Sequence, residues 1–188
     1  MLHSHQLDLF KSLEPIKPSV TYVDHFLPDH DELFCYLSAN IHWNAKFKSR
    51  KTAMFGVSYG SDGKNYQYNT LPDFLTPLCN RIKERFGYRP NSCLINNYPD
   101  GNHYISYHSD QDMDMNKHTG VTIVSLGVVR EMAFRNTADP TLKCYYALQP
   151  GSGMYMDDAV QLDWQHGIPK TKTAGHRISL SFRSLVVK

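Results

Sequence analysis

Two histidines and one aspartate stand where they could bind a single metal ion. His108 and Asp110 lie at the end of a strand-like run, and residues two apart in a strand point to the same face. His166, within the run Gln165–Pro169, supplies a second imidazole. Two histidines and one carboxylate are the ligand pattern of non-haem Fe(II) sites and leave coordination positions open. Because a His-x-Asp tripeptide occurs often by chance, these residues alone also fit an ordinary strand end.

A second chemical feature is an alternating segment near the C-terminus. Over Arg177–Arg183, two arginines and two serines alternate with three apolar residues, so the polar side chains share one face of a strand. Guanidinium groups on an inward face need partners, and arginine binds carboxylates in a bidentate manner. Arg177 and Arg183 could therefore hold the two ends of a small dicarboxylate. The alternative is an amphipathic strand with both arginines in water.

The composition fits one globular domain. The chain has 188 residues, 41% hydrophobic and 20% charged, with a net charge of +2, which excludes collagenous, disordered and polycationic classes. The longest apolar stretch, around Val121–Val129, is too short to span a membrane. No secretory signal is visible in Met1–His5, so we expect a cytoplasmic monomer, or a nuclear one in a eukaryote. The four cysteines do not show the spacing of a metal-binding finger; they are Cys35, Cys79, Cys93 and Cys144.

Hydrophobic periodicity predicts the elements that position these residues. Met1–Pro18 is expected to be an N-terminal arm (residues 1–18) and residues 19–188 the folded domain. Helices are predicted over Asp31–Ala39 and Leu71–Phe86, the second ending at Gly87. Strands are predicted at Val20–Phe26, Cys93–Tyr98, Tyr104–His108, Thr119–Leu126, Glu131–Arg135, Lys143–Leu148, Gly153–Met156, Gln161–His166 and Arg177–Leu185. This order predicts an α+β fold, in which two helices cover one face of an antiparallel sandwich or barrel.

Further motifs stand in the order that one known family shows. They are Arg50 with Thr52–Gly56, Tyr66–Asn69, Asn96–Tyr98, Ser125–Gly127 with Arg130 and Phe134, and Gly151–Gly153 with Met156, Gln161 and Trp164. Together with the metal and arginine motifs, this order resembles the AlkB-like 2-oxoglutarate and Fe(II)-dependent dioxygenases over nearly the whole chain. Ser49 departs from the family's proline, and Ser179 and Ser181 from its asparagine and threonine.

The resemblance implies a double-stranded β-helix, a jelly-roll variant, with Fe(II) and 2-oxoglutarate as cofactors. His108, Asp110 and His166 are implied as the catalytic iron ligands. This fold agrees with the strand-rich second half of the chain.

Four residues are implied around 2-oxoglutarate. Arg183 is expected at the carboxylate far from the metal and Arg177 at the carboxylate near it. Asn96 and Tyr98 are expected to donate hydrogen bonds to this cosubstrate.

The resemblance also implies a nucleic acid carrying alkylated bases, such as 1-methyladenine or 3-methylcytosine in DNA or RNA, as the substrate of a direct-reversal repair reaction. Tyr68 stands where the family stacks an aromatic ring on the flipped base, and Tyr66 where a hydrogen bond reaches the base or its phosphate. Asp112 stands where a carboxylate favours a cationic base. The alternatives are half-buried strand tyrosines and a solvated loop carboxylate. The clusters Lys46–Lys51 and Lys170–Lys172 could contact phosphates or simply form solvated faces.

Two further hypotheses concern the substrate and a protein partner. The same scaffold could instead hydroxylate or demethylate a protein side chain or a small metabolite. Gln6–Phe10 resembles the peptide by which bacterial replication and repair proteins dock on the sliding clamp. The alternative for this segment is that it packs back on the domain.

Overall fold

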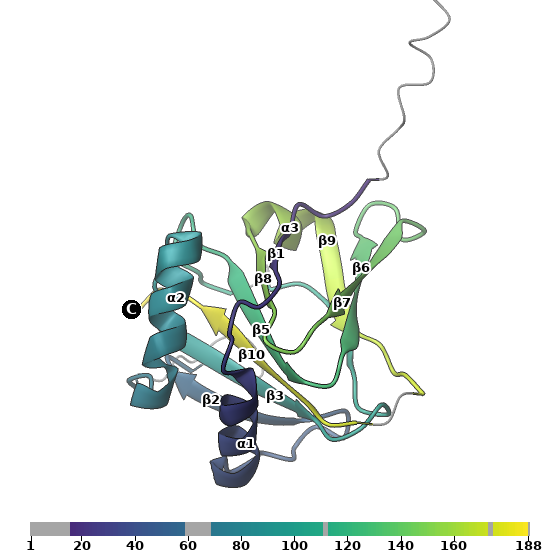
Figure 1. Cartoon of the computed structure of the whole chain (residues 1–188). Helices are drawn as coiled ribbons and strands as arrows, with labels where there is room; N and C mark the ends of the chain where they lie inside the picture. Colours follow the sequence, from purple (N-terminus) through teal and green to yellow (C-terminus); the bar gives the residue numbers. More distant parts are fainter. Residues whose placement is uncertain (1–15, 59–68, 111–112, 173–174, 188) are drawn as a thin grey trace, which may run out of the picture.

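Two antiparallel sheets pack face to face in the computed structural model, which describes residues 16–58, 69–110, 113–172 and 175–187 (Figure 1). The six-stranded sheet has the order β1-β8-β5-β10-β3-β2, and the four-stranded sheet the order β4-β9-β6-β7. The strands are β1 (Thr21–Val23), β2 (Lys51–Gly56), β3 (Ser92–Tyr98), β4 (Ile105–His108), β5 (Val121–Gly127), β6 (Arg130–Asn136), β7 (Lys143–Leu148), β8 (Gly153–Met156), β9 (Trp164–Ile168) and β10 (Arg177–Arg183).

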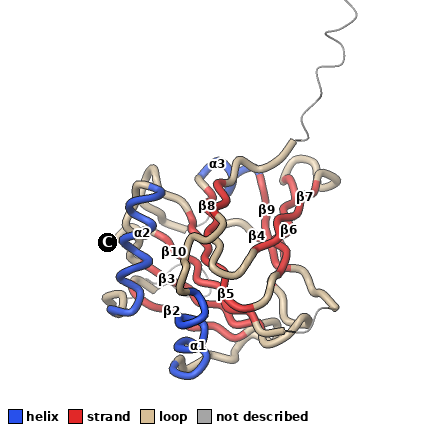
Figure 2. Tube along the Cα trace, in the orientation of Figure 1, coloured by secondary structure: helices blue, strands red, loops and turns tan. Residues whose placement is uncertain are grey.

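Two helices cover the outer face of the six-stranded sheet, as predicted (Figure 2). They are α1 (His30–Asn40) and α2 (Thr76–Phe86), the latter preceded by a 3-10 turn at Asp73–Leu75. Their buried apolar residues form one core cluster with the outer face of β10. At the end of α2, Gly87 has φ 78° and its N–H donates to the Lys83 carbonyl oxygen (3.0 Å), which is a conformation that glycine adopts without strain.

A second core cluster fills the space between the two sheets. It combines Tyr98, Ile123 and Met154 of the six-stranded sheet with Phe134 and Trp164 of the four-stranded one. Apolar side chains from both sheets therefore fill part of the space between them. None of the helices that the structure describes is long and apolar enough to cross a membrane.

The structure corrects several of the sequence-based elements. The predicted strand Gln161–His166 is wrong at its start, because Asp158–Asp163 form a short helix, α3, before β9 begins. Asp157 caps this helix, its Oδ1 accepting from the backbone N–H of Val160 (3.0 Å). Strand β2 was not predicted, and α2 begins later than expected. Most of the predicted arm, residues 1–15, lies outside the described residues.

Candidate active site

A narrow cavity between the sheets is built around the polar face of β10. β10 is central, pairing with β5 on one side and with β3 on the other. Its apolar residues Ile178, Leu180 and Phe182 face the helices, while its arginines and serines line the cavity. The predicted alternation is therefore confirmed. Arg177 is 0% and Arg183 4% exposed, which rules out the reading that places both arginines in water.

The two candidate histidine ligands lie side by side in this cavity. His108 on β4 is the register partner of His166 on β9, and their ring centroids are 4.4 Å apart. His108 Nδ1 contacts the Ser106 carbonyl oxygen (2.9 Å), so Nε2 is the ring nitrogen left for a metal. Burial, followed by the charge of His108, lowers the pKa of His166 to about 3. His166 is therefore neutral near pH 7, as a metal ligand must be.

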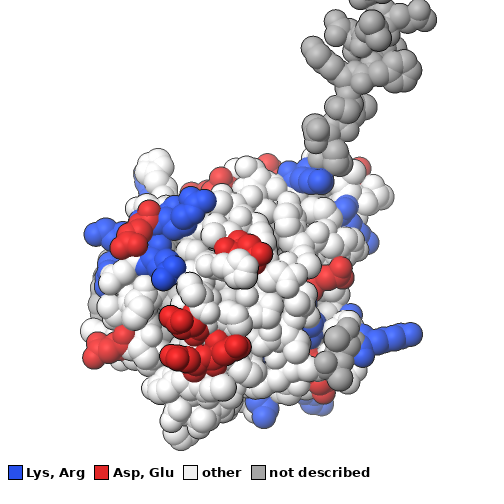
Figure 3. Space-filling model, viewed as in Figure 1, with Lys and Arg blue, Asp and Glu red and all other residues white. Residues whose placement is uncertain are grey.

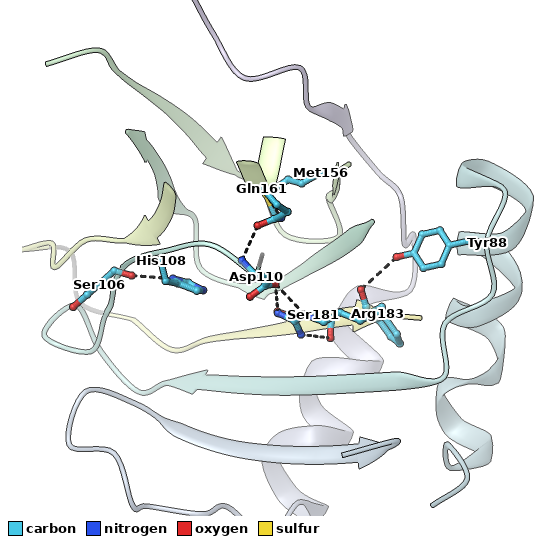
Figure 4. A network of polar contacts seen from close by, with 9 residues as sticks. Tyr88, Ser106, His108, Asp110, Met156, Gln161, Ser181 and Arg183 are labelled. Carbon is cyan, nitrogen blue, oxygen red and sulfur yellow. Dashed lines mark hydrogen bonds and ion pairs between the residues drawn. The ribbon is translucent and has the colours of Figure 1, made fainter. Parts of the chain in front are cut away.

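Asp110, the third candidate ligand, is held by an ion pair (Figure 4). Its Oδ2 accepts from Arg183 Nε (2.9 Å) and Nη2 (2.6 Å), and the side chain is 2% exposed. Burial opposes ionisation of Asp110, but the charge of Arg183, together with the neighbouring histidines and the hydrogen bonds from Arg183, outweighs it, so its pKa lies below the ordinary value. Across the described ranges, no three His, Cys, Asp or Glu side chains are already arranged to hold a metal together. The structure thus brings the two histidines together and turns the carboxylate toward Arg183.

The order of the two arginines is the reverse of the one expected from the family resemblance. Arg183, expected far from the metal, contacts the candidate ligand Asp110. Arg177, expected near the metal, lies at the other end of β10 beside Tyr98, whose ring centroid is 5.2 Å from its Cζ. The physical reason is the direction of β10, which runs toward Asp110 and ends there.

The surroundings of Arg177 fit a carboxylate ligand. Its Nη2 donates to Ser125 Oγ (2.9 Å), but Nε and Nη1 are buried without a hydrogen-bond partner. Burial lowers the pKa of Arg177 to about 10, which leaves it charged at neutral pH. A buried cation with two unused donors is costly, and a dicarboxylate such as 2-oxoglutarate would satisfy them.

The other expected cosubstrate residues also line the cavity. Asn96 and Tyr98 are 3% and 2% exposed, and lie opposite Ser179 and Arg177 in the register of β3 with β10. Asn96 Oδ1 accepts from Arg50 Nε (2.7 Å), which fixes the orientation of its amide. The expected substrate residues Tyr66, Tyr68 and Asp112 lie outside the described residues.

Sequence reasoning missed the role of Arg130, although it noted this residue within a motif. Arg130 is 2% exposed and donates to the carbonyl oxygens of Asp100 (3.2 Å), His103 (3.0 Å) and Pro169 (2.6 Å). It thus ties the β3–β4 loop to the loop after β9, at one edge of the cavity. The signal in the sequence is an arginine at the start of a strand-like run, because a charged side chain in such a run needs hydrogen-bond partners if the strand is buried.

The buried His166 makes the stability of the metal-free protein depend on pH. Its folded-state pKa of about 3 lies below the ordinary 6.5, so the unfolded chain binds more protons between these values. The free energy of unfolding should therefore fall as the pH is lowered from about 6.5 toward about 3. In urea unfolding of the metal-free protein, the free energy of unfolding of His166→Gln should depend less on pH than that of wild type. Substitution of an exposed histidine, in His42→Gln, should leave the pH dependence unchanged. Equal pH dependence in wild type and His166→Gln would contradict this account.

Comparison with known proteins identifies relatives. The family model of the 2OG-Fe(II) oxygenase superfamily matches residues 28–183. The DNA oxidative demethylase ALKBH2 of Bos taurus is 27% identical over 145 residues, covering 69% of this chain and 52% of that protein. The alpha-ketoglutarate-dependent dioxygenase alkB homolog 3 of Homo sapiens is 30% identical over 120 residues, covering 59% and 42%. The match thus spans about half the length of these curated relatives.

Solved structures share the fold. OsALKBH1 has a TM-score of 0.68 at 18% identity, over 90% of this chain and 99% of that chain. A 2OG-Fe(II) oxygenase family oxidoreductase from Burkholderia pseudomallei has a TM-score of 0.62 at 16% identity, over 88% and 85%. The expected jelly-roll fold and the expected cofactors, Fe(II) and 2-oxoglutarate, are confirmed. With the family model matching most of the sequence, the chain is an AlkB-like member of the 2OG-Fe(II) oxygenase superfamily.

Proposed function

We propose that this 2-oxoglutarate- and Fe(II)-dependent dioxygenase oxidatively demethylates N-alkylated nucleobases, such as 1-methyladenine and 3-methylcytosine, in DNA or RNA. The observation that carries the proposal is the buried cavity lined both by the paired histidines and by the guanidinium of Arg177, whose Nε and Nη1 have no hydrogen-bond partner. Similarity to proteins named as a DNA oxidative demethylase and an alkB homolog supports a nucleic-acid substrate.

The residues of the cavity have separate tasks. His108, Asp110 and His166 would hold Fe(II), and Arg177 would bind a carboxylate of 2-oxoglutarate. Bound there, Fe(II) and 2-oxoglutarate would supply the oxidation of an N-methyl carbon by dioxygen, with succinate, carbon dioxide and formaldehyde as products beside the demethylated base. The protein contributes orientation and the exclusion of water, because the remaining lining includes the apolar side chains of Ile123, Met132 and Ile168. The roles of Tyr66, Tyr68 and Asp112 in holding the base remain part of this proposal.

A rim of exposed cations beside the cavity supports a polyanionic substrate. Two segments far apart in the sequence, 46–51 and 170–172, meet at the β3–β4 loop: the Tyr104 N–H donates to the Ser49 carbonyl oxygen (2.8 Å), and Lys170 Nζ lies 5.0 Å from the Tyr104 ring centroid. Arg50 connects this rim to the cavity through Asn96. The exposed cations of the rim are Lys46, Lys48, Lys51, Lys170 and Lys172.

A second group of cations lies over α2 (Figure 3). Arg81 and Arg85 are exposed on this helix, which covers the face of the six-stranded sheet opposite the cavity. These cations therefore serve as a matched control for the rim.

Removing rim charge should weaken nucleic-acid binding and its salt dependence. Lys170→Ala/Lys172→Ala should reduce the slope of log K against log[salt] by about 0.7 for each lost phosphate contact to a single strand. Arg81→Ala/Arg85→Ala removes the same charge and should leave the slope unchanged. The measurement is fluorescence anisotropy of a labelled oligonucleotide over a range of salt concentrations. Equal slopes in the two double variants would contradict a substrate path over the rim.

Succinate release tests the reaction itself. The Fe(II)-loaded protein with 2-oxoglutarate should release succinate in proportion to formaldehyde when given oligonucleotides that contain 1-methyladenine or 3-methylcytosine. Methylated peptides and free methylated nucleosides should give only the background rate. Turnover of a peptide or a free nucleoside, without turnover of any oligonucleotide, would support the alternative substrate classes instead.

The docking peptide Gln6–Phe10 lies outside the described residues and stays a prediction. A fluorescent peptide spanning His3–Ser12 should bind a purified bacterial sliding clamp, because two apolar side chains can fill a pocket while Gln6 hydrogen-bonds at its rim. Leu9→Ala and Phe10→Ala should abolish the binding. Binding that is indifferent to these substitutions would remove this argument for a DNA substrate.

A further inference from the structure

The short helix α3 connects the two sides of the candidate metal site. It is followed directly by β9. The stretch from Gln161 to His166 therefore begins with a residue that contacts the candidate ligand Asp110 and ends with the candidate ligand His166. Figure 4 shows Gln161 reaching the backbone of Asp110 from above, on the side away from Arg183.

The contact of Gln161 with Asp110 is buried and directional. Gln161 is 2% exposed, and its Oε1 accepts from the backbone N–H of Asp110 (2.9 Å). Its Nε2 lies 4.0 Å from the sulfur of the fully buried Met156, which orients the oxygen end of the amide toward Asp110. The cap at Asp157 in turn holds α3 in place.

Asp110 depends on such a contact because it lies beyond the regular hydrogen bonds of β4. Strand β4 ends at His108, so no ladder partner fixes the Asp110 backbone. Its carbonyl oxygen accepts from the Met113 N–H (3.1 Å), and its N–H has Gln161 as acceptor. Both contacts with Arg183 are made by Oδ2, and the carboxylate does not yet form a metal site with the two histidines, so metal binding requires this side chain to adjust while the backbone stays in place.

We propose that Gln161 is a positioning residue for metal binding, which holds the Asp110 backbone so that its carboxylate can reach an ion between His108 and His166. This role of Gln161 rests on the family's use of Fe(II) and does not depend on the nature of the substrate. Removing the acceptor leaves the Asp110 N–H buried without a partner and frees the chain that carries the carboxylate. Residues that orient metal ligands typically contribute about 10–100-fold to metal affinity.

The test measures Mn(II) binding to the full chain without 2-oxoglutarate, by electron paramagnetic resonance of the free ion. Gln161→Met keeps the length of the side chain but removes the acceptor, and should weaken Mn(II) binding by about 10–100-fold. Gln161→Glu presents a carboxyl oxygen at the same reach, and should retain affinity close to wild type. The matched control is Gln165→Met, four residues along, whose side chain instead accepts from Arg135 Nη2 (2.5 Å) on the outer face of the sheet.

A purely structural role predicts a different pattern. Gln161→Met would then unfold at a lower temperature but bind Mn(II) like wild type, which would overturn the proposal. Equal losses of affinity in Gln161→Met and Gln165→Met would overturn it as well. If Gln161→Met does not fold, Gln161→Asn, whose amide is one methylene too short to reach Asp110, takes its place with the same expected loss. In every case the demethylation proposal is tested separately, by the oligonucleotide assay.

Discussion

Asp110→Ala is expected to lose Fe(II) binding and also to destabilise the metal-free fold by about 3–5 kcal/mol. The destabilisation follows from Arg183, which is 4% exposed and has two nitrogens on the Asp110 carboxylate. Taking away that carboxylate removes the ion pair that this buried guanidinium makes with Asp110. Urea unfolding of the metal-free chain measures the loss of stability, and Mn(II) binding measures the loss of the ligand.

His108→Ala is the informative comparison for Asp110→Ala. It removes a candidate ligand whose side chain is less buried and takes part in no ion pair with Arg183, so it should lose activity with little change in the free energy of unfolding. Asp110→Asn, which keeps the shape but not the charge, should fall between the two in stability. If Asp110→Ala unfolds at the same urea concentration as wild type, the buried ion pair does not exist in the metal-free protein.

Arg177→Met is expected to have opposite effects on cosubstrate binding and on stability. Loss of the guanidinium should weaken 2-oxoglutarate binding by about 2–5 kcal/mol, because a buried carboxylate then loses its charged partner. Without 2-oxoglutarate, however, the free energy of unfolding should be maintained or rise, since the wild-type side chain is 0% exposed and leaves Nε and Nη1 unsatisfied.

Calorimetric titration of 2-oxoglutarate into the Mn(II)-loaded protein measures the first effect, and urea unfolding without ligands the second. Ser125→Ala removes the hydrogen bond from Arg177 Nη2 to Ser125 Oγ and should cost only about 1 kcal/mol of affinity. Unchanged 2-oxoglutarate affinity in Arg177→Met would show that the carboxylate binds elsewhere in the cavity.

Local sequence patterns were sufficient to predict an element wherever a few consecutive residues determine which of its faces is buried or where it ends. The alternation over Arg177–Arg183 predicted both the buried polar face of β10 and the apolar face under the helices. Turn and capping residues likewise predicted the end of α2 at Gly87. In both cases the physical cause, side-chain period or backbone conformation, is contained in a few consecutive residues.

The sequence patterns could not predict which residues far apart in the chain meet in the fold. Arg177 and Arg183 have the same parity on β10, so alternation cannot say which of them lies near Asp110; only the direction of the strand in the folded sheet decides it. The helix α3 escaped prediction because six residues are too few for a helical period to differ clearly from a strand pattern. The contact from Gln161 to Asp110 was hidden by the same error.

The central position of β10 links cosubstrate binding to the helix layer. Alternate residues of this one strand contribute to the cavity and to the core beneath α1 and α2, and its backbone pairs with strands on both sides. Its amide protons are therefore protected by the most cooperative part of the molecule, and should exchange with solvent only when the whole domain opens. Bound 2-oxoglutarate raises the free energy of that opening by RT ln(1 + [L]/Kd), so deuterium uptake along β10 reports the affinity of the cavity without any turnover.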